Sequence, residues 1–146
     1  MRTNALIMLF TALMNDYKVF SFMDQLTDCG PLGCFTGRIY RMKAGDHYDS
    51  WHDDIAAGRK IAVSVNLSGE VYKGGCLMLR YKKKPGEIRM VPNTGFGDAV
   101  LFRLGREMEH QVSAVSGRHP KTAYAGWFRS YPDYFKSVQK IKTKIQ

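Results

Sequence analysis

The sequence has few cysteines and no long apolar run, and each shortage excludes a class of protein. Its 146 residues include only three cysteines, and none of them forms a C-x-x-C pair. This excludes a scaffold built on disulfides and favours free thiols in a reducing compartment, so we expect a cytoplasmic protein. The only membrane-like stretch, residues 5–14, is far shorter than the roughly 20 residues of a spanning helix. We expect a buried helix there rather than a signal peptide, because no small-residue cleavage site follows it.

Acidic residues are scarce relative to basic ones. The chain has 22 lysines and arginines against 13 aspartates and glutamates, which gives a formal net charge of +9. Such a charge influences solubility and the choice of partner, and it leaves a nucleic-acid partner open. No zinc finger or RNP-like run accompanies the charge. The lysines are scattered except at Lys82-Lys83-Lys84, a pattern typical of a solvated turn.

The length and composition predict one domain, residues 1–146. A share of 45% hydrophobic and 12% aromatic residues is enough for a single apolar core. We expect a helical N-terminal region over about 1–28, a β core over about 35–130 and a basic tail over 131–146. The lysines of the tail predict a frayed, solvent-exposed end.

The β core is predicted from short runs of β-branched and aromatic residues that alternate with turn residues such as Gly74-Gly75 and Pro85-Gly86. Residues 60–67 alternate apolar and polar side chains with a period of two, as a half-buried strand does. No helical pattern separates the runs, so we expect an antiparallel, mainly β fold: a sandwich, a barrel or a jelly roll. The predicted strands are 35–42, 60–67, 76–81, 88–91, 99–103, 111–115 and 122–129.

Histidine is also scarce: the chain has four, at positions 47, 52, 110 and 119. His52 precedes Asp54 by two residues, so both side chains leave the same face if the segment is extended. An imidazole and a carboxylate are two of the three ligands of a 2-His-1-carboxylate iron site, and His110 on a later strand can supply the third. Zinc accepts the same ligand types, and a solvated surface loop accounts for the spacing as well.

The surroundings of the H-x-D pair form an ordered series of motifs. These are YRMKAGDHYDSWHDD (40–54), RKIAVSVNLS (59–68), YKGGCLML (72–79), GDAVLF (97–102), HQVSAVSG (110–117) and KTAYAGWF (121–128). The series resembles the 2-oxoglutarate- and Fe(II)-dependent dioxygenases of the prolyl 4-hydroxylase type, in the family order. Each motif is short, and the ordered set carries the resemblance.

The resemblance implies a double-stranded β-helix, or jelly roll, with a short N-terminal helical support. It implies a hydroxylase that releases succinate and CO₂ from 2-oxoglutarate. His52, Asp54 and His110 match the iron ligands of the family, which makes them the expected catalytic and metal-binding residues. The implied cofactors are Fe(II), 2-oxoglutarate, O₂ and, in addition, ascorbate.

The resemblance also implies where 2-oxoglutarate binds. Family members hold its distal carboxylate with a basic side chain on the last core strand, six residues before a tryptophan of the closing motif. Lys121 has this spacing from Trp127, and Arg118 is the alternative. Tyr40 matches a tyrosine that hydrogen-bonds 2-oxoglutarate in some relatives, and Tyr48 matches an aromatic residue at the pocket mouth.

Arg59 and Asn66 are two further residues that we expect in or near the site. Arg59 lies where relatives often keep an arginine, with a structural role as one interpretation. Asn66 lies on the polar face of a central strand, where it either reaches the site or is satisfied within the core.

The prime substrate is not encoded in these motifs. A peptidyl proline is the best-known target of the family and is our default expectation, with other peptide, protein or small-molecule substrates open. Two alternative functions stay open: a non-catalytic jelly-roll binding module and a nucleic-acid-directed oxygenase. We expect no membrane partner and assign no oligomeric state.

Overall fold

A computed structural model of the chain describes residues 5–46, 50–92 and 95–145, with side chains described up to residue 140. His47 and Tyr48 lie outside the described residues. The elements follow the order α1 (Ala5–Met14), α2 (Tyr17–Thr27), β1 (Cys34–Met42), β2 (Arg59–Asn66), β3 (Lys73–Gly74), β4 (Leu77–Tyr81), β5 (Arg89–Val91), β6 (Ala99–Arg103), β7 (Met108–Val112), β8 (Val115–Ser116), β9 (Lys121–Arg129) and α3 (Tyr134–Ile145).

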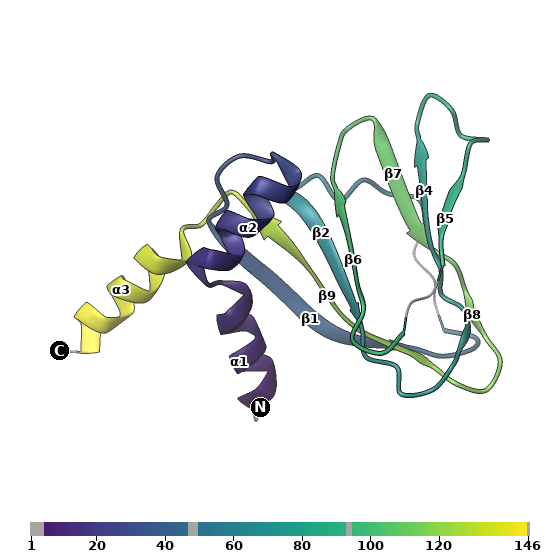
Figure 1. Cartoon of the computed structure of the whole chain (residues 1–146), viewed down its shortest axis with the longest axis horizontal. Helices are drawn as coiled ribbons and strands as arrows, with labels where there is room; N and C mark the ends of the chain where they lie inside the picture. Colours follow the sequence, from purple (N-terminus) through teal and green to yellow (C-terminus); the bar gives the residue numbers. More distant parts are fainter. Residues whose placement is uncertain (1–4, 47–49, 93–94, 146) are drawn as a thin grey trace.

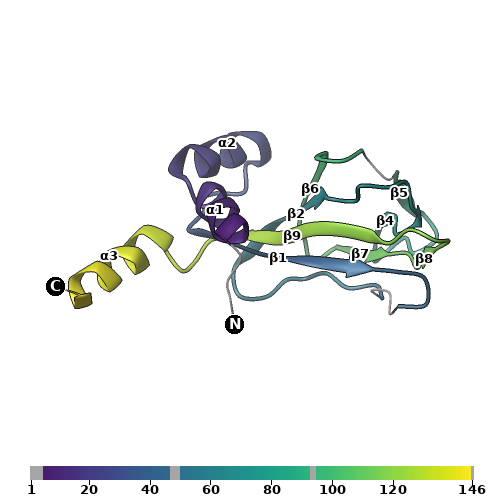
Figure 2. The ribbon, with the colours of Figure 1, turned by 90° about the horizontal axis from the view of Figure 1, so that it is seen from below.

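The strands form two main antiparallel sheets and a short two-stranded ribbon. The larger sheet has the order β1-β9-β2-β6, the smaller has the order β5-β4-β7, and β3 pairs with β8. Neighbours in a sheet are distant in the sequence, because β9 inserts between β1 and β2. Figure 1 shows the helices on the left and the three-stranded sheet on the right, and Figure 2 shows α1 and α2 over one end of β1 and β9. The predicted mainly β, jelly-roll fold with a short helical support is confirmed.

The two faces of the four-stranded sheet differ in chemistry because side chains alternate along each strand. The outer face packs on α2, and this layer contains the hydrophobic core. Its buried members are Phe20, Met23, Phe35, Ile61, Val63, Tyr124 and Phe128. The inner face carries Lys121, Ala125 and Trp127, which line a cavity between the two sheets. The apolar core therefore lies outside the β barrel, and the barrel interior keeps its polar groups.

Asn15 attaches the helical layer to the edge of the larger sheet. This residue lies between α1 and α2 and is 1% exposed. Its Nδ2 donates to the carbonyl oxygens of Thr11 at 2.8 Å and Phe35 at 3.0 Å. Its Oδ1 accepts from the N–H of Phe35 at 2.8 Å. The side-chain amide therefore pairs with Phe35 as the backbone of a neighbouring strand does.

Helix α1 is not the buried helix that the sequence predicted. None of its residues is buried, and Leu6, Leu9 and Leu13 are 73%, 58% and 57% exposed. One stripe of the helix packs against the core, through Ile7, Phe10 and Met14. Along the described chain, no single helix is long and apolar enough to cross a membrane. Only α1 and α2 taken together reach that length and composition, and a bend of 54° separates them.

Two other expectations differ from the structure. The tail forms helix α3 rather than a frayed end, and Phe135 of this helix contacts Phe20 edge to face at a centroid distance of 6.3 Å. The strand predicted at 111–115 is replaced by β7 and β8, which are separated by two residues. The break falls where the Ser113 hydroxyl, rather than a backbone carbonyl, accepts the N–H of Cys76 at 3.0 Å.

We expect Asn15→Ala to lower the free energy of unfolding by about 2–4 kcal/mol, because it leaves the buried N–H and carbonyl of Phe35 without partners. Urea unfolding followed by circular dichroism measures this. Gln25→Ala, at an exposed position of α2, is the control and should change stability by less than about 0.5 kcal/mol. Equal stability of the two variants would contradict the role of Asn15.

Candidate active site

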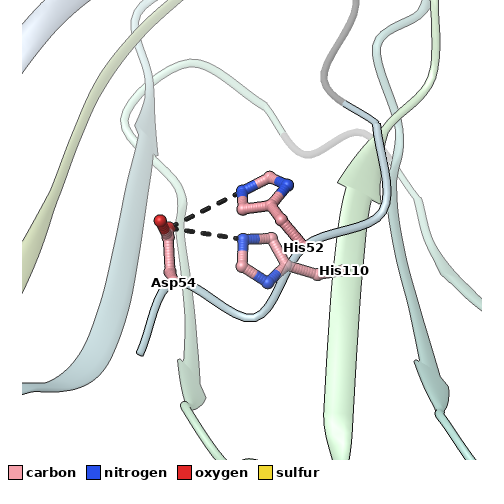
Figure 3. Close-up of side chains that lie close together, drawn as sticks. All are labelled: His52, Asp54 and His110. Atoms are coloured by element: carbon pink, nitrogen blue, oxygen red, sulfur yellow. Dashed lines mark ion pairs between the residues drawn. The ribbon is translucent and has the colours of Figure 1, made fainter. Parts of the chain in front are cut away.

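His52, Asp54 and His110 converge between the two sheets. Oδ2 of Asp54 lies 3.7 Å from Nε2 of His52 and 3.6 Å from Nε2 of His110. All three ligand atoms lie within 4.8 Å of one another, and Figure 3 shows the side chains directed at a common point. These separations are close to the ~3.0–3.5 Å between neighbouring ligand atoms around an ion with bonds of about 2.1 Å. The predicted triad therefore has the donor set and the spacing for a metal ion.

The backbone brings the two histidines together. The N–H of His52 donates to the carbonyl of His110 at 3.0 Å, and the N–H of His110 donates back at 2.8 Å. This reciprocal pair is an isolated antiparallel bridge between β7 and the segment that precedes β2. It sets the two imidazole rings 4.2 Å apart between centroids. Residues 58 positions apart in the chain thus become adjacent ligands.

The shared face expected for the H-x-D pair requires an extended segment, and the structure shows that the segment is not extended. Asp54 has a φ of 56°, in the left-handed region that aspartate tolerates better than most residues. The chain turns at this residue, and the turn, rather than strand alternation, directs the carboxylate toward the histidines. The expected convergence of the side chains is observed, but its geometric cause was wrong.

Both oxygens of Asp54 have fixed partners. Nη1 of Arg59 lies 2.7 Å from Oδ1, and the indole Nε1 of Trp127 donates to Oδ2 at 2.8 Å. The Arg59 guanidinium also stacks on the Trp127 ring, 3.8 Å from its centroid. Burial alone raises the pKa of Asp54, but the contacts with His110, Trp127, Arg59 and His52 outweigh burial and hold this pKa below its usual value. The carboxylate is therefore ionised and oriented.

The tautomer of His52 follows from its second nitrogen. Nδ1 lies 2.6 Å from the carbonyl oxygen of Ser50, which can only accept, so Nδ1 carries the proton. Nε2, on the side of Asp54, is then the nitrogen available to bind a metal ion. His110 is held by Phe102, whose ring contacts it edge to face at 4.9 Å.

A cavity of about 450 Å³ opens beside the triad. It lies between the inner faces of the two sheets, and its lining includes five of the six residues predicted for the site: His52, Asp54, His110, Lys121 and Tyr40. Arg118, the sixth, is exposed in a bend and does not line the cavity. His119 lies in the same bend. Asn66 lines the cavity and accepts the N–H of Ser68 at 3.0 Å, so it is satisfied locally.

Lys121 is a buried cation within this cavity. Only 7% of its surface is exposed, and its Nζ donates to the carbonyl of Gly75 at 2.6 Å. A Cβ at Gly75 would lie 2.9 Å from Cδ of Lys121, and the φ of Gly75 is +63°. Both facts require glycine there, so the Gly-Gly turn of the sequence motif makes room for the lysine side chain.

Sequence reasoning missed two residues of the site. Trp127 was used only to locate Lys121, and its hydrogen bond to Asp54 was not predicted. The signal was the indole N–H, which needs an acceptor when it is half-buried. Tyr72 lines the cavity and had no assigned role. Burial raises the pKa of Tyr72, and its neighbours Tyr40 and Cys76 raise it further. The Tyr72 hydroxyl is therefore protonated and can donate to a ligand.

Comparisons with known proteins agree with this arrangement. Residues 37–129 match the 2OG-Fe(II) oxygenase superfamily, while the curated proteins contain no sequence match. A 2OG-Fe(II) oxygenase family oxidoreductase from Burkholderia pseudomallei has 17% identity and a TM-score of 0.63, covering 83% of this chain and 55% of that one. A prolyl-4-hydroxylase from Pseudomonas putida has 22% identity and a TM-score of 0.63, covering 82% of this chain and 63% of that one. The chain thus shares their fold and spans less than two thirds of either length.

The hydrogen bond from Trp127 gives a test of the metal site. Trp127→Phe keeps an aromatic ring under Arg59 and removes only the N–H donor, so we expect Mn(II) affinity to fall about 10- to 100-fold, as for other residues that orient a ligand. Titration followed by electron paramagnetic resonance measures this. His119→Ala, a histidine outside the triad, should bind Mn(II) as the wild type does. Unchanged affinity in Trp127→Phe would contradict the role of the indole.

Proposed function

Since the chain belongs to the 2OG-Fe(II) oxygenase superfamily, we propose that it is an Fe(II)- and 2-oxoglutarate-dependent dioxygenase that hydroxylates a substrate and releases succinate and CO₂. The observation that carries the proposal is the His52–Asp54–His110 triad at a cavity that also contains a buried lysine. The triad would hold the metal, and the cavity has room for two small ligands.

The donor set fits Fe(II) better than structural zinc. A structural zinc site is closed by four protein ligands, whereas a 2-His-1-carboxylate site leaves coordination positions for other ligands. Within the described part of the chain, no further histidine, cysteine or carboxylate joins the cluster. Bound Fe(II), together with 2-oxoglutarate and O₂, supplies the oxidising chemistry that protein side chains lack.

The chain's own residues prepare the cavity for this chemistry. Asp54 contributes one negative charge to the metal, and Arg59 and Trp127 fix the direction of its oxygens. We assign the distal carboxylate of 2-oxoglutarate to Lys121, because this lysine is the buried cation of the cavity lining and a carboxylate that leaves water needs a cation beside it. Tyr40 and Tyr72, which line the same cavity, are hydrogen-bond donors for this ligand. Apolar residues such as Leu77 and Val91 exclude water from the remaining wall.

For the prime substrate we propose a peptidyl proline. The proposal is in line with the resemblance of the sequence motifs and with the prolyl-4-hydroxylase from Pseudomonas putida that shares the fold. The cavity lies between the two sheets, and the side chains of Tyr40 and Trp127 in its lining are half-buried. An extended peptide can therefore approach the cavity from solvent. Ascorbate is an accessory cofactor under this proposal.

Turnover tests the function directly. Under anaerobic conditions, Fe(II) and 2-oxoglutarate should give the wild-type protein a visible charge-transfer band, and O₂ with a proline-containing peptide should then give succinate. His110→Ala removes a ligand, so both signals should be lost, whereas His119→Ala should keep both. Wild-type-like succinate formation by His110→Ala would overturn the assignment. Metal binding without any succinate in the wild type would favour the non-catalytic binding module.

The KM for 2-oxoglutarate tests whether Lys121 or Arg118 binds this co-substrate. Lys121→Met removes the buried charge at nearly constant length, so we expect the KM for 2-oxoglutarate to rise about 10- to 100-fold, as for loss of a charged hydrogen bond. Arg118→Met, at an exposed position, should change the KM less than about twofold. Mn(II) affinity should stay the same in both variants. The opposite pattern of KM values would transfer the assignment to Arg118.

A further inference from the structure

The cavity contains one charged side chain that the proposed chemistry does not use. Among the described residues, its charged lining consists of Arg38, Asp54, Arg59 and Lys121, apart from the two histidines of the triad. Asp54 and Arg59 pair with each other, and Lys121 is hydrogen-bonded to Gly75. No described residue forms an ion pair or a hydrogen bond with the Arg38 guanidinium. Arg38 is thus a cation at the cavity whose partner is not a described part of this chain.

The register of the sheet places Arg38 between the metal side and the lysine side of the cavity. Arg38 pairs with Ala125 of β9, which in turn pairs with Ser64 of β2. The next inward-facing row on one side contains Trp127, the hydrogen-bond donor to Asp54. Lys121 lies two rows away on the other side, and successive rows on one face are about 7 Å apart. Arg38 therefore lines the cavity from a row between that of Trp127 and that of Lys121.

The neighbours of Arg38 leave space for a planar ligand. Ala125 and Ser64 both have small side chains, so neither covers the guanidinium along its own row. Arg38 is exposed whereas Lys121 is 7% exposed, so the two cations stand at different depths of one cavity. The deep cation is assigned to the co-substrate, and the exposed one is accessible to a prime substrate that comes from solvent.

We propose that Arg38 is a specificity-determining residue and that the prime substrate carries a carboxylate close to the carbon that is hydroxylated. The proposal rests on the proposed function for the position of the reacting carbon. A guanidinium presents two parallel N–H donors that match the two oxygens of a carboxylate. The single charge of Arg38 balances the single charge of a carboxylate, whereas a phosphate dianion calls for a second cation, and the other cations of the lining are already engaged. For a peptidyl substrate, the carboxylate belongs to a glutamate or aspartate next to the proline.

Strand β1 supplies a matched control for Arg38. Residues 38, 40 and 42 pair with inward-facing residues of β9, so Arg41 lies on the opposite face of the same strand. Arg41 is exposed and does not line the cavity. Replacing Arg41 by glutamine removes the same charge at nearly the same place in the chain without touching the cavity.

The test measures binding as well as turnover. Mn(II)-loaded protein with 2-oxoglutarate is titrated with the peptide Ac-Gly-Ala-Pro-Glu-Ala-Gly-NH₂ and with its glutamine counterpart, using the fluorescence of the cavity tryptophan, Trp127. We expect the wild type and Arg41→Gln to bind the glutamate peptide about tenfold more tightly, the size of one charged hydrogen-bonded pair. Arg38→Gln should bind the two peptides equally, and Arg38→Lys should recover part of the preference. N-acetylglutamate against N-acetylglutamine repeats the comparison for a small acid.

The outcomes separate this inference from the proposed function. A preference for the glutamate peptide that persists in Arg38→Gln would overturn the role of Arg38. The same holds if the wild type prefers neither the glutamate peptide over the glutamine peptide nor N-acetylglutamate over N-acetylglutamine. A phosphoserine peptide bound more tightly than the glutamate peptide would overturn the carboxylate assignment. Because Mn(II) replaces Fe(II), the preference is measured without turnover. Absence of succinate with Fe(II) would therefore remove the proposed activity and leave the measured selectivity of the cavity in place.

Discussion

The register of β9 between β1 and β2 is the constraint on which both the core and the site depend. The strand alternates Tyr124 and Phe128, which face the helices, with Ala125 and Trp127, which face the cavity. A slip of one residue would exchange the two sets and place aromatic rings in the cavity and a lysine in the apolar core. Pairing on both edges, with nine partners on β1 and seven on β2, holds this register. Stability and ligand chemistry are thus set by the same hydrogen-bond ladder.

Within the site, charge is organised around Asp54. A partly buried carboxylate is costly alone, yet here an arginine, an indole N–H and two imidazoles surround it. The same contacts that keep the group ionised fix its direction, and the backbone turns at this residue with a φ of 56°. A site arranged in this way presents its negative charge before any metal arrives.

The sequence predicted most strands and the triad because both depend on local patterns. Alternation defines strands such as 60–67 from a few residues, and the H-x-D pair with a distal histidine needs only motif order. What it missed depends on distant partners. In α1 only one stripe meets the core, and the rest of the helix stays exposed. The turn at Asp54 coincides with the contacts of its carboxylate with Arg59 and Trp127. The break between β7 and β8 coincides with the hydrogen bond between Ser113 and Cys76. The motif spacing already favoured Lys121 over Arg118, and the burial of Lys121 beside the Gly-Gly turn is what only the fold could add.

Asn15 has a consequence for how this protein meets other chains. Strand β1 is the edge of the larger sheet, and an edge strand offers its unpaired N–H and carbonyl groups to any extended segment nearby. The Asn15 amide occupies those groups of Phe35 from within the same molecule. It thus ends the sheet at the point where α1 and α2 meet it, so that intermolecular strand pairing cannot begin there. One side chain acts as a stop against edge-to-edge association.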